Sequence, residues 1–338
     1  MTRKGRQWFQ RTTPLAVLGV LLGLPAGAQT RPDPALYGGA PALPVTEITG
    51  ATAGPTVAVV AGVHGGKVAA IHALDSLRRH LAGRVLRGRV LLVGPANLAG
   101  YRAGLAQISP DDSLNLNRVF PGRSDGRPTE RLAARLMREI VSVSNYLVDM
   151  HGSDGDEAVG RFAYAARPGI DPRVDRAARD LAVAWGVPVI VWDDAGPRTL
   201  ADSRFLQTAA HLSGVPAITV FEAGSTREDS AATSAFVEGA LRVLRQLDVI
   251  ASQSPASQHP VVLARRSVVT APADATWRPA TSPGATLSSR EPVGWLQSSS
   301  GEETAVLAPD GGLVLHLRLA GPVRAGTPLV ITGIAPAP

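Results

Sequence analysis

The sequence contains no cysteine, so no disulfide stabilises this chain and its fold must rest on an apolar core. Aromatic residues make up only 4% of it, and no arginine-rich run is interleaved with them, which argues against a base-stacking surface for nucleic acids. Lysine occurs only at Lys4 and Lys67, and arginine supplies every other basic side chain. No segment approaches the roughly 18 uninterrupted apolar residues of a transmembrane helix, which argues against a stable membrane span.

The amino terminus has the composition of a secretory signal peptide. Its first eleven residues carry four basic and no acidic side chains, an apolar run follows from Pro14 to Leu24, and residues 26–28 spell the cleavage signal A-G-A. We therefore predict a signal peptide over residues 1–28 and a mature protein that is periplasmic or secreted, with an uncleaved membrane anchor as the alternative. Loss of this leader lowers the net charge from +6 to about +2, so the charge gives no indication of a nucleic-acid partner.

The rest of the chain divides by composition into three segments. Residues 29–44 are rich in Pro, Gly and Ala without periodicity, which predicts a flexible linker. Residues 45–252 alternate short Val, Ile and Leu runs with amphipathic helical patterns, which predicts an α/β domain with a mostly parallel or mixed central sheet covered by helices on both faces. A shift to Ser, Gln and Pro follows, and residues 260–338 show short β-runs broken by Gly and Pro, which predict a small all-β domain of sandwich or barrel type.

Three of the apolar runs end in a side chain that can carry chemistry. His64 follows TVAVVAGV, His151 follows YLVDM, and Glu222 closes AITVF. Because the carboxyl ends of parallel strands meet at one edge of a sheet, we expect these three side chains to lie in one site. Two imidazoles and a carboxylate suit a hydrolytic zinc centre, in which the metal lowers the pKa of water and the carboxylate moves protons. A hydrogen-bonded scaffold role is the alternative for each of the three.

Four motifs resemble those of the succinylglutamate desuccinylase/aspartoacylase family, which has a zinc carboxypeptidase-like fold. GVHGGK from Gly62 is similar to G-x-H-G-x-E, and NLNRVFPG from Asn115 is similar to D-L-N-R-x-F-P-G. DMHG from Asp149 is similar to the D-L-H segment, and VFEAG from Val220 is similar to the strand that supplies the catalytic Glu. The resemblance implies a zinc-dependent hydrolase that cleaves the amide bond of an N-acyl amino acid or peptide-like substrate.

The resemblance also implies roles for five individual residues. His64 and His151 fall on the two zinc histidines of the family, and Glu222 falls on the general base. Asn117 and Arg118 fall on the pair that holds the substrate carboxylate, a task for which the planar guanidinium is well suited. The expected partner is therefore a small molecule or peptide that bears a carboxylate, and the alternative for Asn117 and Arg118 is a structural pair that shapes their loop.

Three positions depart from the family pattern. Lys67 takes the position of the zinc-binding Glu, Gln107 falls where the family has a substrate-polarising Arg, and Asn115 replaces the Asp of D-L-N-R. An ammonium has no lone pair to offer a metal and its charge repels a dication, so Lys67 weakens the case for a zinc cofactor. Lys67 indicates either an abandoned metal site or a new task, such as neutralising Glu222 or anchoring an anionic ligand.

Other residues near the motifs offer weaker alternatives. Asp154, Asp156 and Glu157 could complete a metal site, but acidic residues on such a loop are typical of solvated turns. His72 is predicted on the first helix, pointing elsewhere. Ser153 in HGSDG has a partial likeness to a nucleophile elbow, although the segment lacks a separate base.

Two functions remain in competition at this point. The first is an exported zinc-dependent amide hydrolase with a divergent metal site, favoured because His64, His151 and Glu222 are all present. The second is a metal-free, catalytically inactive ligand-binding protein that keeps the carboxylate-binding crevice, as Lys67 and Gln107 indicate. Bound zinc would distinguish the two.

Overall fold

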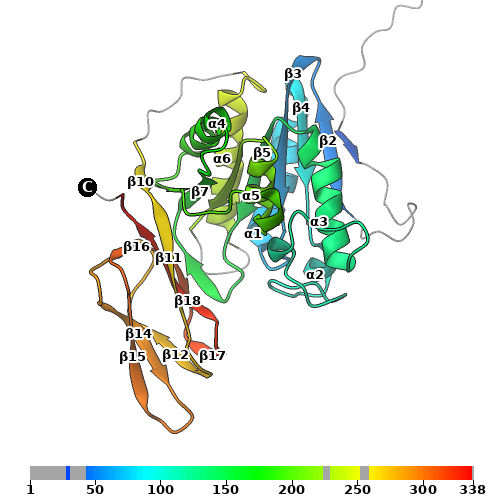
Figure 1. Ribbon diagram of the computed structural model, residues 1–338. Coiled ribbons are helices and arrows are strands. Elements are labelled where there is room, and N and C mark those ends of the chain that lie inside the picture. Colours follow the sequence, from blue (N-terminus) through cyan, green and yellow to red (C-terminus); the bar gives the residue numbers. More distant parts are fainter. Residues whose placement is uncertain (1–27, 31–42, 224–228, 252–258, 337–338) are drawn as a thin grey trace, which may run out of the picture.

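The computed structural model describes residues 28–30, 43–223, 229–251 and 259–336 (Figure 1). Its largest feature is a nine-stranded mixed sheet. In spatial order the described strands of this sheet are β1 (Ala28–Thr30), β2 (Val45–Thr49), β4 (Arg87–Val93), β3 (Thr52–Ala61), β5 (Tyr146–His151), β9 (Ala217–Phe221), β7 (Phe162–Ala166), β8 (Val189–Asp193) and β10 (Val261–Leu263).

The directions of the strands decide which loops meet. Strands β4, β3, β5 and β9 run parallel, whereas β7 runs antiparallel to β9. In register, Val60 of β3 lies beside Asp149 of β5, and His151 lies beside Phe221 of β9, which in turn lies beside Phe162 at the start of β7. The carboxyl ends of β3, β5 and β9 therefore share one edge of the sheet with the beginning of β7.

Helices cover both faces of this sheet, as the sequence pattern predicted (Figure 1). The helices α1 (Val68–Leu81), α4 (Pro172–Trp185) and α6 (Ser230–Gln246) bury their apolar sides in one core cluster. The helices α3 (Pro128–Glu139) and α5 (Leu206–Leu212) pack on the other face. Short helical turns occupy the connections: α2 (Leu98–Arg102), η2 (Leu116–Arg118), η3 (Val141–Val143) and η4 (Leu200–Asp202).

Helix α4 shows how local sequence sets these boundaries. The Asp171 side chain accepts a hydrogen bond from the backbone N–H of Arg173, and Pro172 occupies the first helical position, where no N–H is needed. The helix ends at Gly186, whose φ of 86° lies in the left-handed region that favours glycine. These stop and start signals place Trp185, the last residue of α4, against the sheet with no exposed surface.

The carboxyl-terminal part is all-β and antiparallel, as predicted, and its two sheets enclose a core of their own. At its centre Trp277 is completely buried, and its indole N–H donates a 3.0 Å hydrogen bond to the Arg318 carbonyl. One sheet contains β11 (Arg265–Thr270), β18 (Pro328–Ile334), β16 (Gly312–Arg318) and β13 (Thr286–Leu287). The other contains β15 (Glu303–Leu307), β14 (Pro292–Gln297), β12 (Ala275–Pro279) and β17 (Gly321–Val323).

The two parts of the chain are joined by shared strands. Strand β6 (Glu157–Val159), from the α/β part, pairs with β16, and β10 from the carboxyl-terminal segment pairs with β8. Of the predicted linker, residues 29 and 30 belong to β1, which pairs with β2. Strand β6 therefore places the loop after His151 directly against the carboxyl-terminal sheet.

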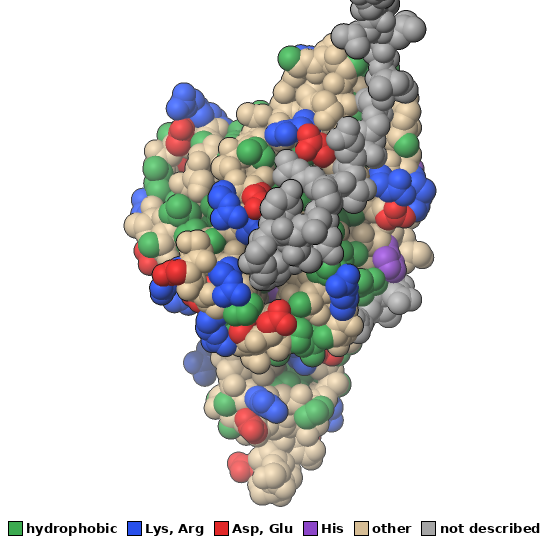
Figure 2. Space-filling model, turned by 90° about the vertical axis from the view of Figure 1, so that its right-hand side faces the viewer, with side chains coloured by type: hydrophobic (Ala, Val, Ile, Leu, Met, Phe, Trp, Pro, Cys, Tyr) green, Lys and Arg blue, Asp and Glu red, His purple; other side chains and the backbone are tan. Residues whose placement is uncertain are grey.

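The described surface carries charges of both signs. On the face shown in Figure 2, acidic and basic side chains are interspersed rather than gathered by sign. None of the described helices is long and apolar enough to cross a membrane. The predicted signal peptide lies outside the described residues except for Ala28.

Candidate functional site

The structure brings the two predicted histidines together. His64 follows β3 and His151 ends β5, and their ring centroids are 5.2 Å apart in an edge-to-face arrangement with an interplanar angle of 84°. Both side chains are buried. This arrangement follows from the parallel register of β3 and β5, which delivers both loops to the same edge of the sheet.

Hydrogen bonds fix the orientation of the His64 ring. Its Nε2 lies 3.0 Å from Asn115 Oδ1, which also accepts from the backbone N–H of Asn117. Because that oxygen is an acceptor only, Nε2 carries the proton and Nδ1 is the free nitrogen. This Nδ1 is buried and has no hydrogen-bond partner among the described residues. Burial, together with the charges of His151 and Lys67, holds the pKa of His64 well below its ordinary value, so the ring is neutral.

A carboxylate orients the second ring in the same way. His151 Nε2 lies 3.0 Å from Oδ2 of Asp149, whose side chain is fully buried. A carboxylate that holds one ring nitrogen directs the other toward a ligand, as in metal sites where the outer partner fixes the tautomer. Each imidazole therefore has one ring nitrogen held by a side-chain oxygen, and these two rings are the groups that would donate to a metal here.

Lys67 falls where the family resemblance places the third zinc ligand, and in the structure it is an ammonium paired with carboxylates. It stands just before α1, is 3% exposed, and its Nζ lies 2.5 Å from Glu157 Oε1 and 3.3 Å from Asp154 Oδ2. Burial alone would lower the pKa of Lys67, but these two carboxylates outweigh burial and raise it. Neutralising Glu222 was one of the two tasks suggested for Lys67, and in the structure Glu157 and Asp154 pair with the amine instead.

In the described structure the carboxylate of Glu222 bonds to Trp185 and Arg161 and to neither imidazole. Its Oε1 accepts a 2.7 Å hydrogen bond from Trp185 Nε1, and its Oε2 accepts a 2.6 Å bond from Arg161 Nε. Side chains alternate along an extended chain, and Phe221 packs its ring 5.5 Å from the His151 ring. The next side chain, Glu222, therefore points toward α4, and the described geometry does not join it to the histidines.

The two residues of the predicted carboxylate clamp differ in their surroundings. Asn117 is buried and its Oδ1 accepts a 2.9 Å hydrogen bond from the Leu206 backbone, so its side chain fixes the loop. The Arg118 guanidinium lies 5.0 Å from the Phe205 ring centroid, and its Nη1 donates to the Asn117 carbonyl. Burial and the nearby charges of Arg266 and Arg204 lower the pKa of Arg118. Arg118 thus remains available for an anion.

The remaining predicted residues lie around this centre. Gln107 is exposed, and its Nε2 lies 3.5 Å from Asp154 Oδ2. His72 is exposed on α1, as expected. Asp156 has an exposed side chain, but the interpretation of Asp154 as a solvated turn residue was wrong, because Lys67 provides it with a buried partner. The Ser153 hydroxyl donates to the Glu157 carbonyl within the turn.

One ring near the histidines was missed by the sequence analysis. His316 on β16 packs edge-to-face on Phe221, with centroids 4.8 Å apart, and its Nδ1 lies 3.6 Å from Glu157 Oε2. Its position depends on the pairing of β16 with β6, two segments far apart along the chain. No local signal in the sequence identifies that pairing.

The donor set does not fit a zinc ion held by three protein ligands. Catalytic zinc sites use three such ligands and leave one position open. Here two imidazoles are in place and the third position holds a protonated amine. Among the residues that the structure describes, no group of three His, Cys, Asp or Glu side chains is arranged to hold a metal.

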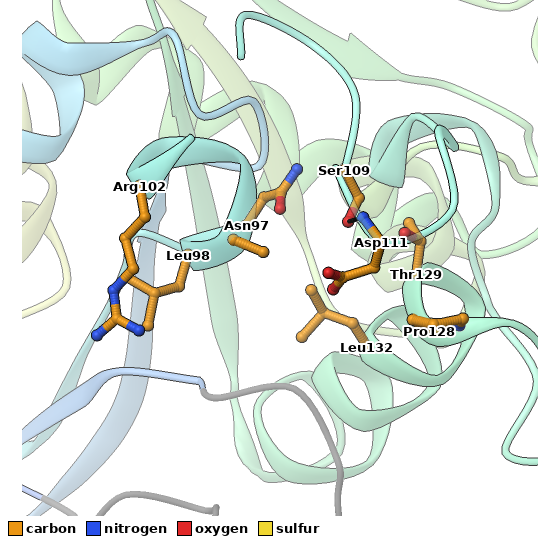
Figure 3. A pocket seen from close by; sticks show the side chains of 9 residues that line it. Asn97, Leu98, Arg102, Ser109, Asp111, Pro128, Thr129 and Leu132 are labelled. Carbon is orange, nitrogen blue, oxygen red and sulfur yellow. Dashed lines mark hydrogen bonds between the residues drawn. The ribbon is translucent and has the colours of Figure 1, made fainter. Parts of the chain in front are cut away.

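A separate cavity of about 180 Å³ lies beside this loop, between α2 and α3 (Figure 3). Figure 3 shows Asn97 and Leu98 on one side and Asp111, Thr129 and Leu132 on the other. None of the predicted site residues lines it. The cavity is therefore distinct from the histidine site.

The fold and paired histidines point to a class of amide-bond deacylases, and comparison with known proteins agrees. A model of the succinylglutamate desuccinylase/aspartoacylase catalytic domain matches residues 53–247, which is more than half of the chain. The chain therefore belongs to this family.

Two curated relatives have related activities in their names. The chain is 34% identical over 154 residues to N-alpha-acetyl-L-2,4-diaminobutyric acid deacetylase of Halomonas elongata, covering 45% of this chain and 44% of the relative. It is 32% identical over 136 residues to succinylglutamate desuccinylase of Burkholderia orbicola, covering 37% and 39% respectively. The chain thus spans less than half the length of either curated relative.

Two solved structures are similar over most of their length. The product-bound ectoine utilization protein EutE (DoeB) of Ruegeria pomeroyi is 25% identical with a TM-score of 0.74, covering 86% of this chain and 88% of that chain. A succinylglutamate desuccinylase/aspartoacylase of Rhodobacter sphaeroides has a TM-score of 0.76 at 21% identity, covering 88% and 90%. The second likeness shows the fold alone.

Proposed function

We propose that this protein binds a small acylated amino acid through its carboxylate, without a metal ion and without hydrolysing the amide bond. The observation that carries this proposal is the Lys67 ammonium, which takes the third ligand position and is neutralised there by Glu157 and Asp154. The orientation of Glu222 toward Trp185 adds support, because its carboxylate is not placed to exchange protons with a substrate near the histidines.

Arg118 is the residue that we assign to the ligand carboxylate. Its guanidinium is held by the Asn117 carbonyl and the Phe205 ring, and neither contact neutralises its charge. A guanidinium that pairs with no carboxylate among the described residues favours an anion that can accept two hydrogen bonds. The named substrates of the two curated relatives are acylated amino acids, which fit this chemistry.

We also propose that binding takes place in the periplasm or outside the cell. The basic start, the apolar run and the A-G-A site of the first 28 residues support export. Mass spectrometry of protein recovered from the extracytoplasmic fraction of expressing cells tests this. A mature amino terminus at Gln29 is expected, and an uncleaved cytoplasmic protein would contradict it.

A zinc-dependent amide hydrolase is the second candidate, favoured by one observation. Both imidazoles have Nε2 within hydrogen-bond distance of a side-chain oxygen. His64 Nδ1 is buried and has no partner in the part of the chain that the structure describes, which suits a metal ligand. In that case His64 and His151 would hold the zinc, and a side chain other than Lys67, Asp154 and Glu157 would supply the further ligand.

Calorimetric titration with N-acetyl and N-succinyl amino acids, followed by an assay for released amine, separates the two candidates. We expect micromolar binding and no free amine, with or without added zinc. Arg118→Ala should abolish binding, while Arg138→Ala, on the exposed side of α3, should leave it unchanged. Steady release of amine would establish the hydrolase, and absence of binding across the series would contradict the binding proposal.

A further inference from the structure

The disagreement between this donor set and zinc has a specific structural form. The position that the family pattern gives to a carboxylate carries an amine, and the carboxylates come instead from the loop after β5 and from β6. In this chain Lys67 supplies the positive charge, and Asp154 and Glu157 supply the negative charges.

These three groups form a largely buried cluster. The side chains of Lys67 and Asp154 are 4% and 0% exposed, and that of Glu157 is 20% exposed. Gln107 Nε2 lies 3.5 Å from Asp154 Oδ2, the oxygen that also contacts Lys67, and His316 Nδ1 lies 3.6 Å from Glu157 Oε2, the oxygen that does not contact Lys67. Two carboxylates at this depth require a positive charge between them, because each would otherwise be buried uncompensated.

We propose that the Lys67 ammonium fills a cation site built from Asp154 and Glu157, and that a divalent metal binds there only after the amine is removed. The two carboxylate oxygens that contact Nζ are hard donors of the kind that divalent ions accept. In the native protein the ammonium occupies their common centre and repels a second cation. This cation site does not depend on whether the protein binds an acylated amino acid.

Removal of the amine tests the proposal directly. Lys67→Ala in the full chain should bind zinc at least about a hundredfold more tightly than wild type by calorimetry, because two buried carboxylates lose their cation. Lys67→Ala combined with Glu157→Gln should lose this gain, and Lys67→Arg should not show it. Arg78→Ala, which removes one of the two arginines that pair with the exposed Asp75 on α1, is the matched control and should gain no zinc affinity.

A second measurement on the wild type covers the case in which Lys67→Ala fails to fold. The sequence contains two lysines, and cleavage of the predicted signal peptide removes Lys4, so ¹⁵N-lysine labelling of the mature protein gives a single ammonium signal, that of Lys67. The Lys67 signal should persist unchanged in excess zinc. Its loss on zinc addition, or a folded Lys67→Ala that gains no zinc affinity, would overturn the proposal.

Discussion

The indole Nε1 of Trp185 donates a 2.7 Å hydrogen bond to Oε1 of Glu222, and this contact directs the expected general base away from the imidazoles. Arg161 holds the other carboxylate oxygen. Glu222 therefore acts on α4 and the loop before β7, where it satisfies a buried indole.

Substitution of Glu222 should affect stability more than ligand binding. Glu222→Leu leaves the Trp185 N–H buried without an acceptor, which we expect to lower the free energy of unfolding by about 2 kcal/mol. Glu222→Gln keeps one acceptor and should cost less. Urea unfolding measures both changes, and calorimetry should find ligand affinity unaltered. A large loss of affinity at unchanged stability would instead place Glu222 in the binding site.

Removal of the Lys67 charge should be strongly destabilising. Lys67→Met leaves Asp154 and Glu157 as buried, uncompensated anions, which we expect to cost about 3–5 kcal/mol in urea unfolding at neutral pH. The double variant Lys67→Met, Glu157→Gln should recover part of that loss. Arg138→Met, which breaks an exposed ion pair, should change stability by less than about 1 kcal/mol. Equal effects of the two single variants would show that the buried cluster is not compensated as described.

The buried His64 ring should make the protein sensitive to mild acid. Its pKa is lowered by burial and by the charges of His151 and Lys67, so the folded state favours the neutral ring. The stability that the neutral ring contributes is fully present above pH 6.5, the ordinary pKa of histidine. It is lost as the pH falls from 6.5 toward the lower pKa of the folded state. Between these values the free energy of unfolding should fall by up to about 1.4 kcal/mol per pH unit more in wild type than in His64→Asn. Parallel pH profiles would refute a neutral buried imidazole.

Of the two residues of the predicted carboxylate clamp, Arg118 should affect ligand affinity and Asn117 should affect stability. Arg118→Lys keeps the charge but loses the planar fork, so the Kd for an acylated amino acid should rise about tenfold. Asn117→Ala removes the acceptor of the Leu206 N–H and should cost about 1–2 kcal/mol of stability. Calorimetry and urea unfolding on both variants give the comparison. The reverse pattern would mean that Asn117, and not Arg118, holds the ligand.

The sequence was sufficient for the fold and for the His64–His151 pair, because periodic apolar runs locate parallel strands and their carboxyl ends. It was not sufficient for Glu222, whose direction depends on which face of β9 each side chain takes. The partners of Lys67 could not be identified from the sequence either. Glu157 reads as part of a polar turn, and only the long-range pairing of β6 with β16 buries it.

In our proposal the Lys67 ammonium, paired with Glu157 and Asp154, excludes zinc from the native site. Elemental mass spectrometry of wild-type protein, expressed with zinc in the medium and purified without chelator, measures this directly. We predict less than about a tenth of an equivalent of zinc per chain. Close to one equivalent, retained through dialysis, would contradict the account.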